Sequence, residues 1–521
     1  MNNSLIRFLP LLSGLLFTLA WPENGWAPLI FLAWIPLLFS SDYYMAHRKK
    51  KFFPILYLSF FLFNLFTTYW IWYATPVGAI VALTANSFLM AFTFWIWHKF
   101  RAKLPRKMAW ALLPALWISF EKLHYVWDLE WPWLTMGNVF AASPEQVQWY
   151  EFTGVFGGTL WILLVNMYVY FWIKNRSRFH TFRWVFTLFL PLILSFFLYR
   201  SYREKGEEAS VLLLQPNIDP WTEKFDRKNS ESIVDLIKLA EPYADSVDLI
   251  IAPETALARA IDKDDMGNEK FTALLMQFKQ KHPRADWLIG ATLYNFVDKN
   301  GPIPSTANQT RAGDWYQLYN SALYYKSDNQ PEMYHKKILV PGAEKMPFHR
   351  FLSPLIGDIV LNLGGATGTH TPSPQPVVFE NSNRRIKVAP IICYESVFGD
   401  YVRRYVQKGA NLLAVITNDG WWKKTGGYRQ HFHYARLRSI ENRRDLVRSA
   451  NTGRSGHINQ RGDIMASLAY DRRGVLVVKP RLNEEITFYA RHGDFIARVA
   501  VFVALVLLIY GLGKKRIKLS F

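Results

Sequence analysis

Residues 386–408, IKVAPIICYESVFGDYVRRYVQK, contain the two patterns on which the fold prediction rests. The first part, Ile386–Cys393, is a short apolar run of the kind that forms a buried strand. The second part, Phe398–Lys408, has the spacing of a helix. Cys393, the only cysteine in 521 residues, lies between them. A nucleophile at such a junction is held rigidly, and a helix N-terminus there is expected to lower the thiol pKa.

The same alternation of strands and helices extends over the segment from Tyr202 to Gly493. Strands are expected at Ser210–Leu214, Val247–Ile251, Trp287–Ile289, Ser321–Tyr325, Ile386–Cys393, Leu412–Thr417, His457–Asn459 and Val475–Val478. Helices are expected at Ser230–Ala240, Asn268–Lys281, Phe398–Lys408 and Gln430–Arg448. Strands that alternate with helices predict an α/β domain with buried sheets.

The remainder of the chain is apolar and rich in aromatic residues, with 21 Trp and 38 Phe overall. Membrane spans are expected at Leu5–Trp21, Trp26–Phe39, Phe53–Tyr73, Gly78–Trp97, Met108–Phe120, Phe152–Ile173, Trp184–Tyr199 and Phe495–Leu512. Trp26–Phe39 and Met108–Phe120 are short enough to be interfacial or re-entrant instead. A cleaved signal peptide is the alternative for the first span, but no small-residue cleavage site follows it.

The charges between the spans predict how the chain is oriented. Every second loop is basic, as are the residues after the last span: Arg48, Lys49, Lys50 and Lys51; Lys99, Arg101, Lys103, Arg106 and Lys107; Lys174, Arg176, Arg178 and Arg183; and Lys514, Lys515, Arg516 and Lys518. The positive-inside rule places these segments and both termini in the cytoplasm. Much of the net charge of +20 therefore reflects membrane topology, which weakens a nucleic-acid function. Three parts follow: a seven-helix membrane domain (1–201), an extracytoplasmic domain (202–493), and a last span with a basic tail (494–521).

Three segments of the predicted α/β domain contain candidate catalytic residues. Glu254 follows an apolar strand in APETA, where a carboxylate can serve as a general base. Lys336 and Lys337 in YHKK precede the apolar run ILVP, and a lysine beside a thiolate stabilises it. Cys393 is the candidate nucleophile. Taken singly, each has a simpler interpretation: an inert buried cysteine, a solvent-facing glutamate and surface lysines.

The order of these residues resembles the catalytic pattern of the nitrilase superfamily: a Glu follows one strand, a Lys precedes another, and a Cys follows a third. The resemblance extends over nearly the whole chain to its multi-span branch, the apolipoprotein N-acyltransferase family. The matching motifs are QPN at Gln215–Asn217, PETA at Pro253–Ala256, YHK with LVP at Tyr334–Pro341, CYE at Cys393–Glu395, TNDGWW at Thr417–Trp422 and ANTGRSG at Ala450–Gly456.

The resemblance implies a four-layer αββα sandwich and a catalytic triad. In that pattern Cys393 is the nucleophile, Glu254 the general base, and Lys336 the group that stabilises the thiolate and the oxyanion. Glu344, Tyr394 and Glu395 then support the triad. Four aromatic residues of the domain are candidates for the substrate entrance: Phe348, Phe351, Trp421 and Trp422.

The resemblance also implies a reaction. An acyl chain passes from a membrane phospholipid, by way of a cysteine thioester, to the α-amine of the diacylglyceryl-cysteine of an apolipoprotein. The expected location is the bacterial inner membrane, with a periplasmic catalytic domain and a monomeric chain. We expect no cofactor, metal or nucleic acid, because the sequence has neither metal-ligand spacing nor a nucleotide-binding glycine motif.

Two other functions remain compatible with these residues. One is a membrane-tethered amidase that uses the same triad with water as the acceptor, although eight spans are more than a tether needs. The other is a multi-span scaffold whose outer domain is inactive. The presence of Glu254, Lys336 and Cys393 argues against the scaffold.

Overall fold

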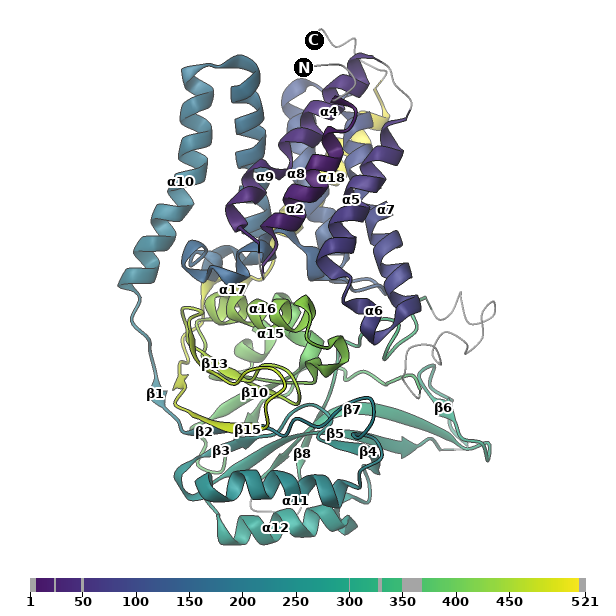
Figure 1. Ribbon diagram of the computed structural model, residues 1–521, viewed down its shortest axis with the longest axis vertical. Helices are drawn as coiled ribbons and strands as arrows, with labels where there is room; N and C mark the ends of the chain where they lie inside the picture. The colour runs from purple at the N-terminus through teal and green to yellow at the C-terminus, as the bar shows by residue number, and fades with distance from the viewer. Residues whose placement is uncertain are drawn as a thin grey trace. The chain divides into compact units, whose positions relative to one another are not determined.

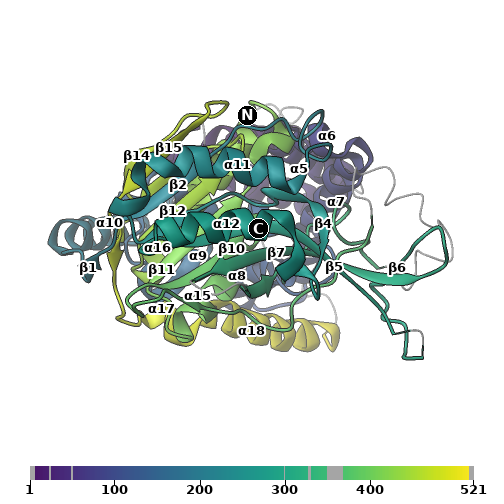
Figure 2. The ribbon, with the colours of Figure 1, turned by 90° about the horizontal axis from the view of Figure 1, so that it is seen from below.

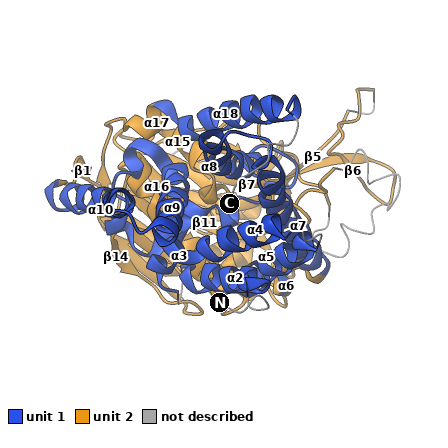
Figure 3. Cartoon of the chain, turned by 90° about the horizontal axis from the view of Figure 1, so that it is seen from above, with its two compact units in different colours: residues 1–72, 77–201, 492–521 blue, residues 73–76, 202–491 orange. Residues whose placement is uncertain are grey.

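The chain forms two compact units, which Figure 3 colours separately. The structure is a computed structural model that describes residues 6–22, 25–47, 51–298, 300–326, 330–348 and 368–514. Unit 1 comprises residues 1–72, 77–201 and 492–521, and unit 2 comprises residues 73–76 and 202–491.

The regular secondary structure of the described residues of unit 1 is entirely helical (Figure 1). Its longer helices are α2 (Leu9–Ala20), α4 (Ile35–Ala46), α5 (Phe52–Thr68), α7 (Pro76–Phe100), α8 (Arg106–Leu123), α9 (Tyr150–Asn175), α10 (Arg178–Ser201) and α18 (Phe495–Leu512). Short helical turns join them: η1 (Ala27–Leu29), α3 (Ile30–Ala33), α6 (Ile71–Ala74), η2 (Pro132–Leu134), η3 (Met136–Ala142) and η4 (Pro144–Gln146). A helix therefore lies at each of the eight apolar spans.

Five of the described helices are long and apolar enough to cross a membrane: Ala27–Ala46, Pro76–Phe100, Tyr150–Asn175, Arg178–Ser201 and Phe495–Leu512. Two of the predicted spans were short, and both are longer in the structure. Apart from Trp26, the span Trp26–Phe39 lies within a helical stretch that runs from Ala27 to Ala46, and Met108–Phe120 lies within the 18-residue helix α8. The flanking charged residues of α8 still form helix, so hydropathy alone underestimated its length. Helix α10 is the least buried of these five: only 6% of its 18-residue apolar window is buried within the protein. Apolar side chains with so little protein cover are typical of a helix that faces lipid.

Unit 2 contains two sheets. The strands of the eight-stranded sheet are β2 (Val211–Gln215), β3 (Leu249–Ile251), β4 (Leu257–Asp262), β5 (Asp286–Phe296), β6 (Asn308–Gln309), β7 (Trp315–Tyr325), β8 (Glu332–His335) and β15 (Gly474–Val478). Those of the six-stranded sheet are β9 (Phe379–Glu380), β10 (Lys387–Ile392), β11 (Leu412–Thr417), β12 (Leu446–Ala450), β13 (Gly456–Ile458) and β14 (Ile464–Ser467). A two-stranded ribbon pairs β1 (Glu207–Glu208) with β16 (Arg481–Leu482).

The two sheets pack face to face, with helices on both outer surfaces. Helices α11 (Asn229–Ala240) and α12 (Lys270–Lys281) lie side by side over the eight-stranded sheet (Figure 2). Helices α15 (Gly399–Gln407) and α16 (Gly426–Asn442) cover the other sheet (Figure 1). Between the sheets, Ser449 Oγ donates to the Leu214 carbonyl at 2.8 Å. The expected αββα sandwich is confirmed.

The order of strands explains why the site lies where it does. Strands β2, β3 and β5 run parallel, as do β10, β11 and β12. Their residues are almost entirely buried, which is typical of parallel strands covered on both faces. The C-terminal ends of parallel strands lie at the same edge of their sheet. The loops after β3, β10 and β11 therefore converge.

One predicted helix was too long. The sequence predicted helix over Gln430–Arg448, but α16 ends at Asn442, and Arg443 adopts a left-handed conformation with φ of 47° that stops it. The following residues enter β12, which places Arg448 in a central strand. The many charged residues of this segment resemble a solvated helix face, yet they are buried in unit 2.

Candidate functional site

Cys393 lies directly after β10, at the first residue of the five-residue 3₁₀ helix η7 (Cys393–Val397). Its φ of 49° is in the left-handed region, which is strained for a residue other than glycine. The Cys393 carbonyl accepts hydrogen bonds from Ser396 Oγ at 2.7 Å and from His431 Nε2 at 3.1 Å. These contacts hold the backbone in this conformation, so the direction of the thiol is set by the fold.

The surroundings of Cys393 favour the neutral thiol over the thiolate. Burial raises its pKa, and the negative charge of Glu254 raises it further, while Lys336 opposes them. The prediction that a helix N-terminus lowers this pKa was wrong, because η7 is a single short turn and burial outweighs it. A thiol of this kind needs a base to become a nucleophile.

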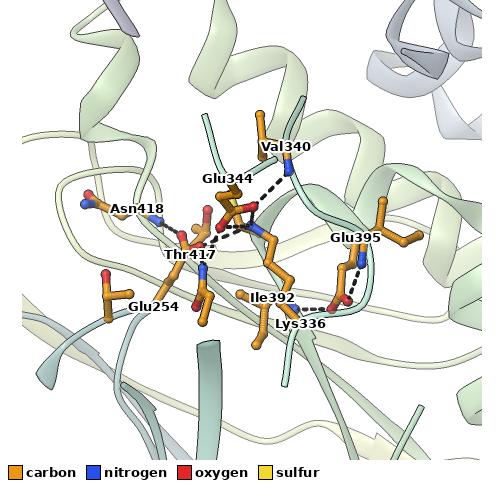
Figure 4. Close-up of polar contacts among 12 residues, drawn as sticks. Glu254, Lys336, Val340, Glu344, Ile392, Glu395, Thr417 and Asn418 are labelled. Carbon is orange, nitrogen blue, oxygen red and sulfur yellow. Dashed lines mark hydrogen bonds and ion pairs between the residues drawn. The ribbon is translucent and has the colours of Figure 1, made fainter. Parts of the chain in front are cut away.

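Glu254 lies in the turn that follows β3, as the sequence predicted, and the residue is 6% exposed. Asn320 Nδ2 donates to Glu254 Oε1 at 2.8 Å, and the backbone N–H of Asn418 donates to Oε2 at 3.0 Å. Lys336 Nζ lies 3.5 Å from Oε1 (Figure 4). Both carboxylate oxygens are therefore oriented by donors from different elements.

Lys336 is 1% exposed and lies between two carboxylates (Figure 4). Its Nζ is 2.9 Å from Glu344 Oε2 and 3.0 Å from Glu344 Oε1. Burial by itself lowers the pKa of Lys336, but the charges of Glu344 and Glu254 outweigh it and raise the pKa above its usual value. Burial likewise raises the pKa of Glu344, and Lys336 reverses this effect so that the net shift is downward. The charged form of Lys336 is therefore favoured.

The strand expected after Lys336 is absent from that position. Lys336 instead follows strand β8, which ends at His335; residues 337–338 form a bend and residues 342–344 form a turn. Pro341 has no N–H for a sheet ladder, and Gly342 has φ of 80°. The turn brings the Val340 N–H to within 2.8 Å of Glu344 Oε2, which orients Glu344 toward Lys336.

Glu395 is completely buried and joins the residues after β10 to those after β8. Its Oε1 accepts from Tyr334 Oη at 2.5 Å and from the Lys337 N–H at 2.7 Å, and its Oε2 accepts from the Ile392 N–H at 2.9 Å. Burial raises its pKa to about 7. The neighbouring Tyr394 is also buried, and its ring packs edge-on against Phe398.

A second group behind Cys393 was missed by sequence reasoning. Asp419 Oδ1 lies 3.0 Å from His431 Nδ1, and Arg448 Nη2 lies 2.8 Å from Asp419 Oδ2. All three side chains are completely buried. Burial raises the pKa of Asp419, but Arg448 and His431 outweigh it and lower the pKa to about 2. The only signal was Asp419 within the TNDGWW motif. Asn320 was also missed; it donates to both Glu254 and Glu344.

The entrance candidates have different surroundings. Trp421 packs edge-on against Trp221 with 5.0 Å between ring centroids and also faces Phe225, so three aromatic residues group at this surface. The Trp422 ring packs edge-on against the His431 ring, with 5.5 Å between their centroids. Phe348 is half-buried, and Phe351 lies outside the described residues.

The chain matches two described protein families. Residues 13–168 match the apolipoprotein N-acyltransferase N-terminal domain, and residues 213–491 match the carbon-nitrogen hydrolase family. The apolipoprotein N-acyltransferase of Chlorobaculum tepidum is 30% identical, over 98% of this chain and 97% of the relative. That of Geobacter metallireducens is 25% identical, over 94% and 92%. Among solved structures, an amidase from Nesterenkonia sp. is 15% identical over 57% of this chain and 97% of its own, with a TM-score of 0.37.

Proposed function

The chain belongs to the apolipoprotein N-acyltransferase family, and from that membership we propose its reaction in detail. The enzyme transfers an acyl chain from a membrane phospholipid to the N-terminal α-amine of the diacylglyceryl-cysteine of apolipoproteins, the last step of lipoprotein maturation. A thioester on Cys393 is the intermediate. The observation that carries this proposal is a buried carboxylate–lysine pair, Glu254 and Lys336, whose charges act on a thiol with a raised pKa.

In the first half-reaction Glu254 removes the proton from Cys393 Sγ. The thiolate attacks the carbonyl carbon of an acyl ester, and the carbonyl oxygen becomes an oxyanion. Lys336 and the backbone N–H of Tyr394 stabilise that charge. The ester C–O bond then breaks, Glu254 returns the proton to the departing lysophospholipid oxygen, and the acyl group remains on sulfur.

In the second half-reaction the α-amine of the lipoprotein attacks the thioester carbonyl. Glu254 accepts the proton lost by the amine, the C–S bond breaks, and the proton returns to sulfur. Glu344 and Glu395 do not react. Glu344 keeps Lys336 charged and in place, and Glu395 links the Cys393 turn to the residues that follow Lys336. We further propose that Phe348, Phe351, Trp421 and Trp422 contact the lipid substrates.

The test of this reaction is intact-mass analysis of the purified full chain in detergent with a phospholipid. We expect the mass to increase by one acyl group, and a synthetic diacylglyceryl lipopeptide to remove that group and become N-acylated. A folded protein that never acquires the acyl group contradicts the proposal. Release to water alone, with no lipopeptide product, identifies the membrane-tethered amidase instead.

We propose that the protein is integrated in the bacterial inner membrane with both termini in the cytoplasm and unit 2 in the periplasm. The support is the basic character of the loops that include Lys99–Lys107 and Lys174–Arg183. A reporter that is active only in the cytoplasm is expected to be active when fused after Phe521 and inactive when inserted near Asn300. The opposite pattern overturns this orientation.

A further inference from the structure

Unit 2 has a second buried lysine near the triad, and the reaction described above does not use it. Lys224 is 4% exposed. Its Nζ donates to the Glu254 carbonyl at 3.1 Å and to Thr255 Oγ1. A buried ammonium group is unfavourable unless its partners compensate for the lost hydration. Both partners belong to the turn that carries the general base.

That turn is strained and closely confined. Thr255 has φ of 46°, in the left-handed region. On one side strand β5 approaches so closely that a Cβ at Gly290 would lie 2.4 Å from the Pro253 carbonyl oxygen and 2.6 Å from Glu254 Cα. A second support comes from Lys224, whose ammonium group contacts the Glu254 carbonyl and the Thr255 hydroxyl. Strain of this kind persists only when the surroundings hold it in place.

The charge of Lys224 also acts on the reacting groups. Burial lowers its pKa to about 8, and the charges of the Glu254 carboxylate and of Cys393 in its thiolate form oppose that shift. The thiol itself faces Glu254, Lys336 and Asp419 as well. Removing the positive charge at residue 224 is therefore expected to make the Cys393 thiolate less favourable.

We propose that Lys224 is a positioning residue for acyl transfer: its ammonium group holds the Glu254–Thr255 turn and thereby the Glu254 carboxylate beside Lys336. This inference rests on the proposed function, in which Glu254 is the general base. The contacts of Glu254 with Asn418 and Asn320 need this backbone position, because each comes from a different strand or loop.

The first test compares Lys224→Met with Lys279→Met. Lys279 is a matched control, since it is 3% exposed and its Nζ donates to the Ala285 carbonyl and to Asp286, both at 2.8 Å. Methionine fits at residue 224 because Leu236 and Ala256 line the small cavity beside it. Both variants are expected to unfold at lower temperature. Only Lys224→Met is expected to slow acylation of Cys393, by about 10- to 100-fold, and to move its pH profile upward.

The second test leaves the lysine in place. Thr255→Val removes the hydroxyl acceptor, and Thr255→Ser restores it. We expect Thr255→Val to slow acylation by about 3- to 10-fold and Thr255→Ser to retain nearly the wild-type rate. When Thr255→Val is combined with Lys224→Met, the loss of rate is expected to be smaller than the two single losses combined. Folded Lys224→Met and Thr255→Val proteins with wild-type rates and pH profiles overturn the inference. Absence of acylation in the wild-type protein contradicts the proposed function instead, so the two failures are distinguishable.

Discussion

Cys393→Ala is expected to abolish acyl transfer, with a loss of roughly 10⁴-fold or more in turnover. The reason is that covalent catalysis requires a nucleophile in the place that the β10–η7 junction provides, and no other thiol exists among the 521 residues. Intact-mass analysis of the variant with phospholipid is expected to show only the unmodified chain. N-acylated lipopeptide is expected to be absent as well.

The fold should survive this substitution. The Cys393 backbone is held through its carbonyl, by Ser396 and His431, and neither contact involves the thiol. Cys393→Ser is a useful second variant, because it keeps a small polar side chain but lacks an easily ionised group. We expect both variants to unfold within a few degrees of the wild type. An acyl adduct on the folded Cys393→Ala protein would place the nucleophile elsewhere.

Lys336→Met is expected to have the second-largest effect, because it removes both the oxyanion-stabilising charge and the partner of two buried carboxylates. We expect acyl transfer to fall by about 10²- to 10³-fold, the usual consequence of losing one oxyanion-stabilising group. Breaking a buried ion pair from one side also destabilises a protein by about 3–5 kcal/mol. Acylation rate and urea unfolding of the same preparations measure the two effects separately.

Lys337→Met is the matched control, since Lys337 is adjacent but only half-buried, and its contacts with Glu395 and Tyr334 use the backbone N–H. Lys337 lies in the bend after β8, and its contact with Glu395 does not use its ammonium group. We expect its rate and stability to stay close to those of the wild type. Equal losses in the two variants would contradict the assignment of Lys336.

The pH dependence of stability should change sign in Lys336→Met. In the wild type the pKa of Glu344 is lowered, so its contribution is present near neutral pH and is lost as the pH falls. Without Lys336, burial raises the pKa of Glu344, so this carboxylate binds a proton more tightly in the folded than in the unfolded chain. Stability then decreases as the pH rises. Unfolding measured at about pH 5 and about pH 8 distinguishes these slopes.

Several features of the fold were predictable because they depend on local sequence. Strand β11 lies at Leu412–Thr417 and helix α18 at Phe495–Leu512, as the apolar runs indicated. The junction at Cys393 and the turn at Glu254 also follow directly from the ends of apolar strands. Local periodicity sufficed in these cases because burial on both faces of a strand demands an uninterrupted apolar run.

Other features depended on contacts that no local pattern reveals. Arg448 was predicted to end a helix, yet it lies in a central strand, where it forms an ion pair with Asp419. The run after Lys336 was read as a strand, but it turns so that Glu344 can reach the ammonium group.

The sequence by itself determined the residue types available for catalysis, their order along the chain, and the alternation that produces two packed sheets. Only the tertiary structure decided how they meet. Glu254 and Lys336 are 82 residues apart, and their 3.5 Å contact exists because the loops after β3 and β8 converge. The same convergence buries these groups, raises the pKa of the Cys393 thiol and raises the pKa of Lys336 above its usual value. Burial and long-range charge set these properties, and both arise only when distant segments pack together.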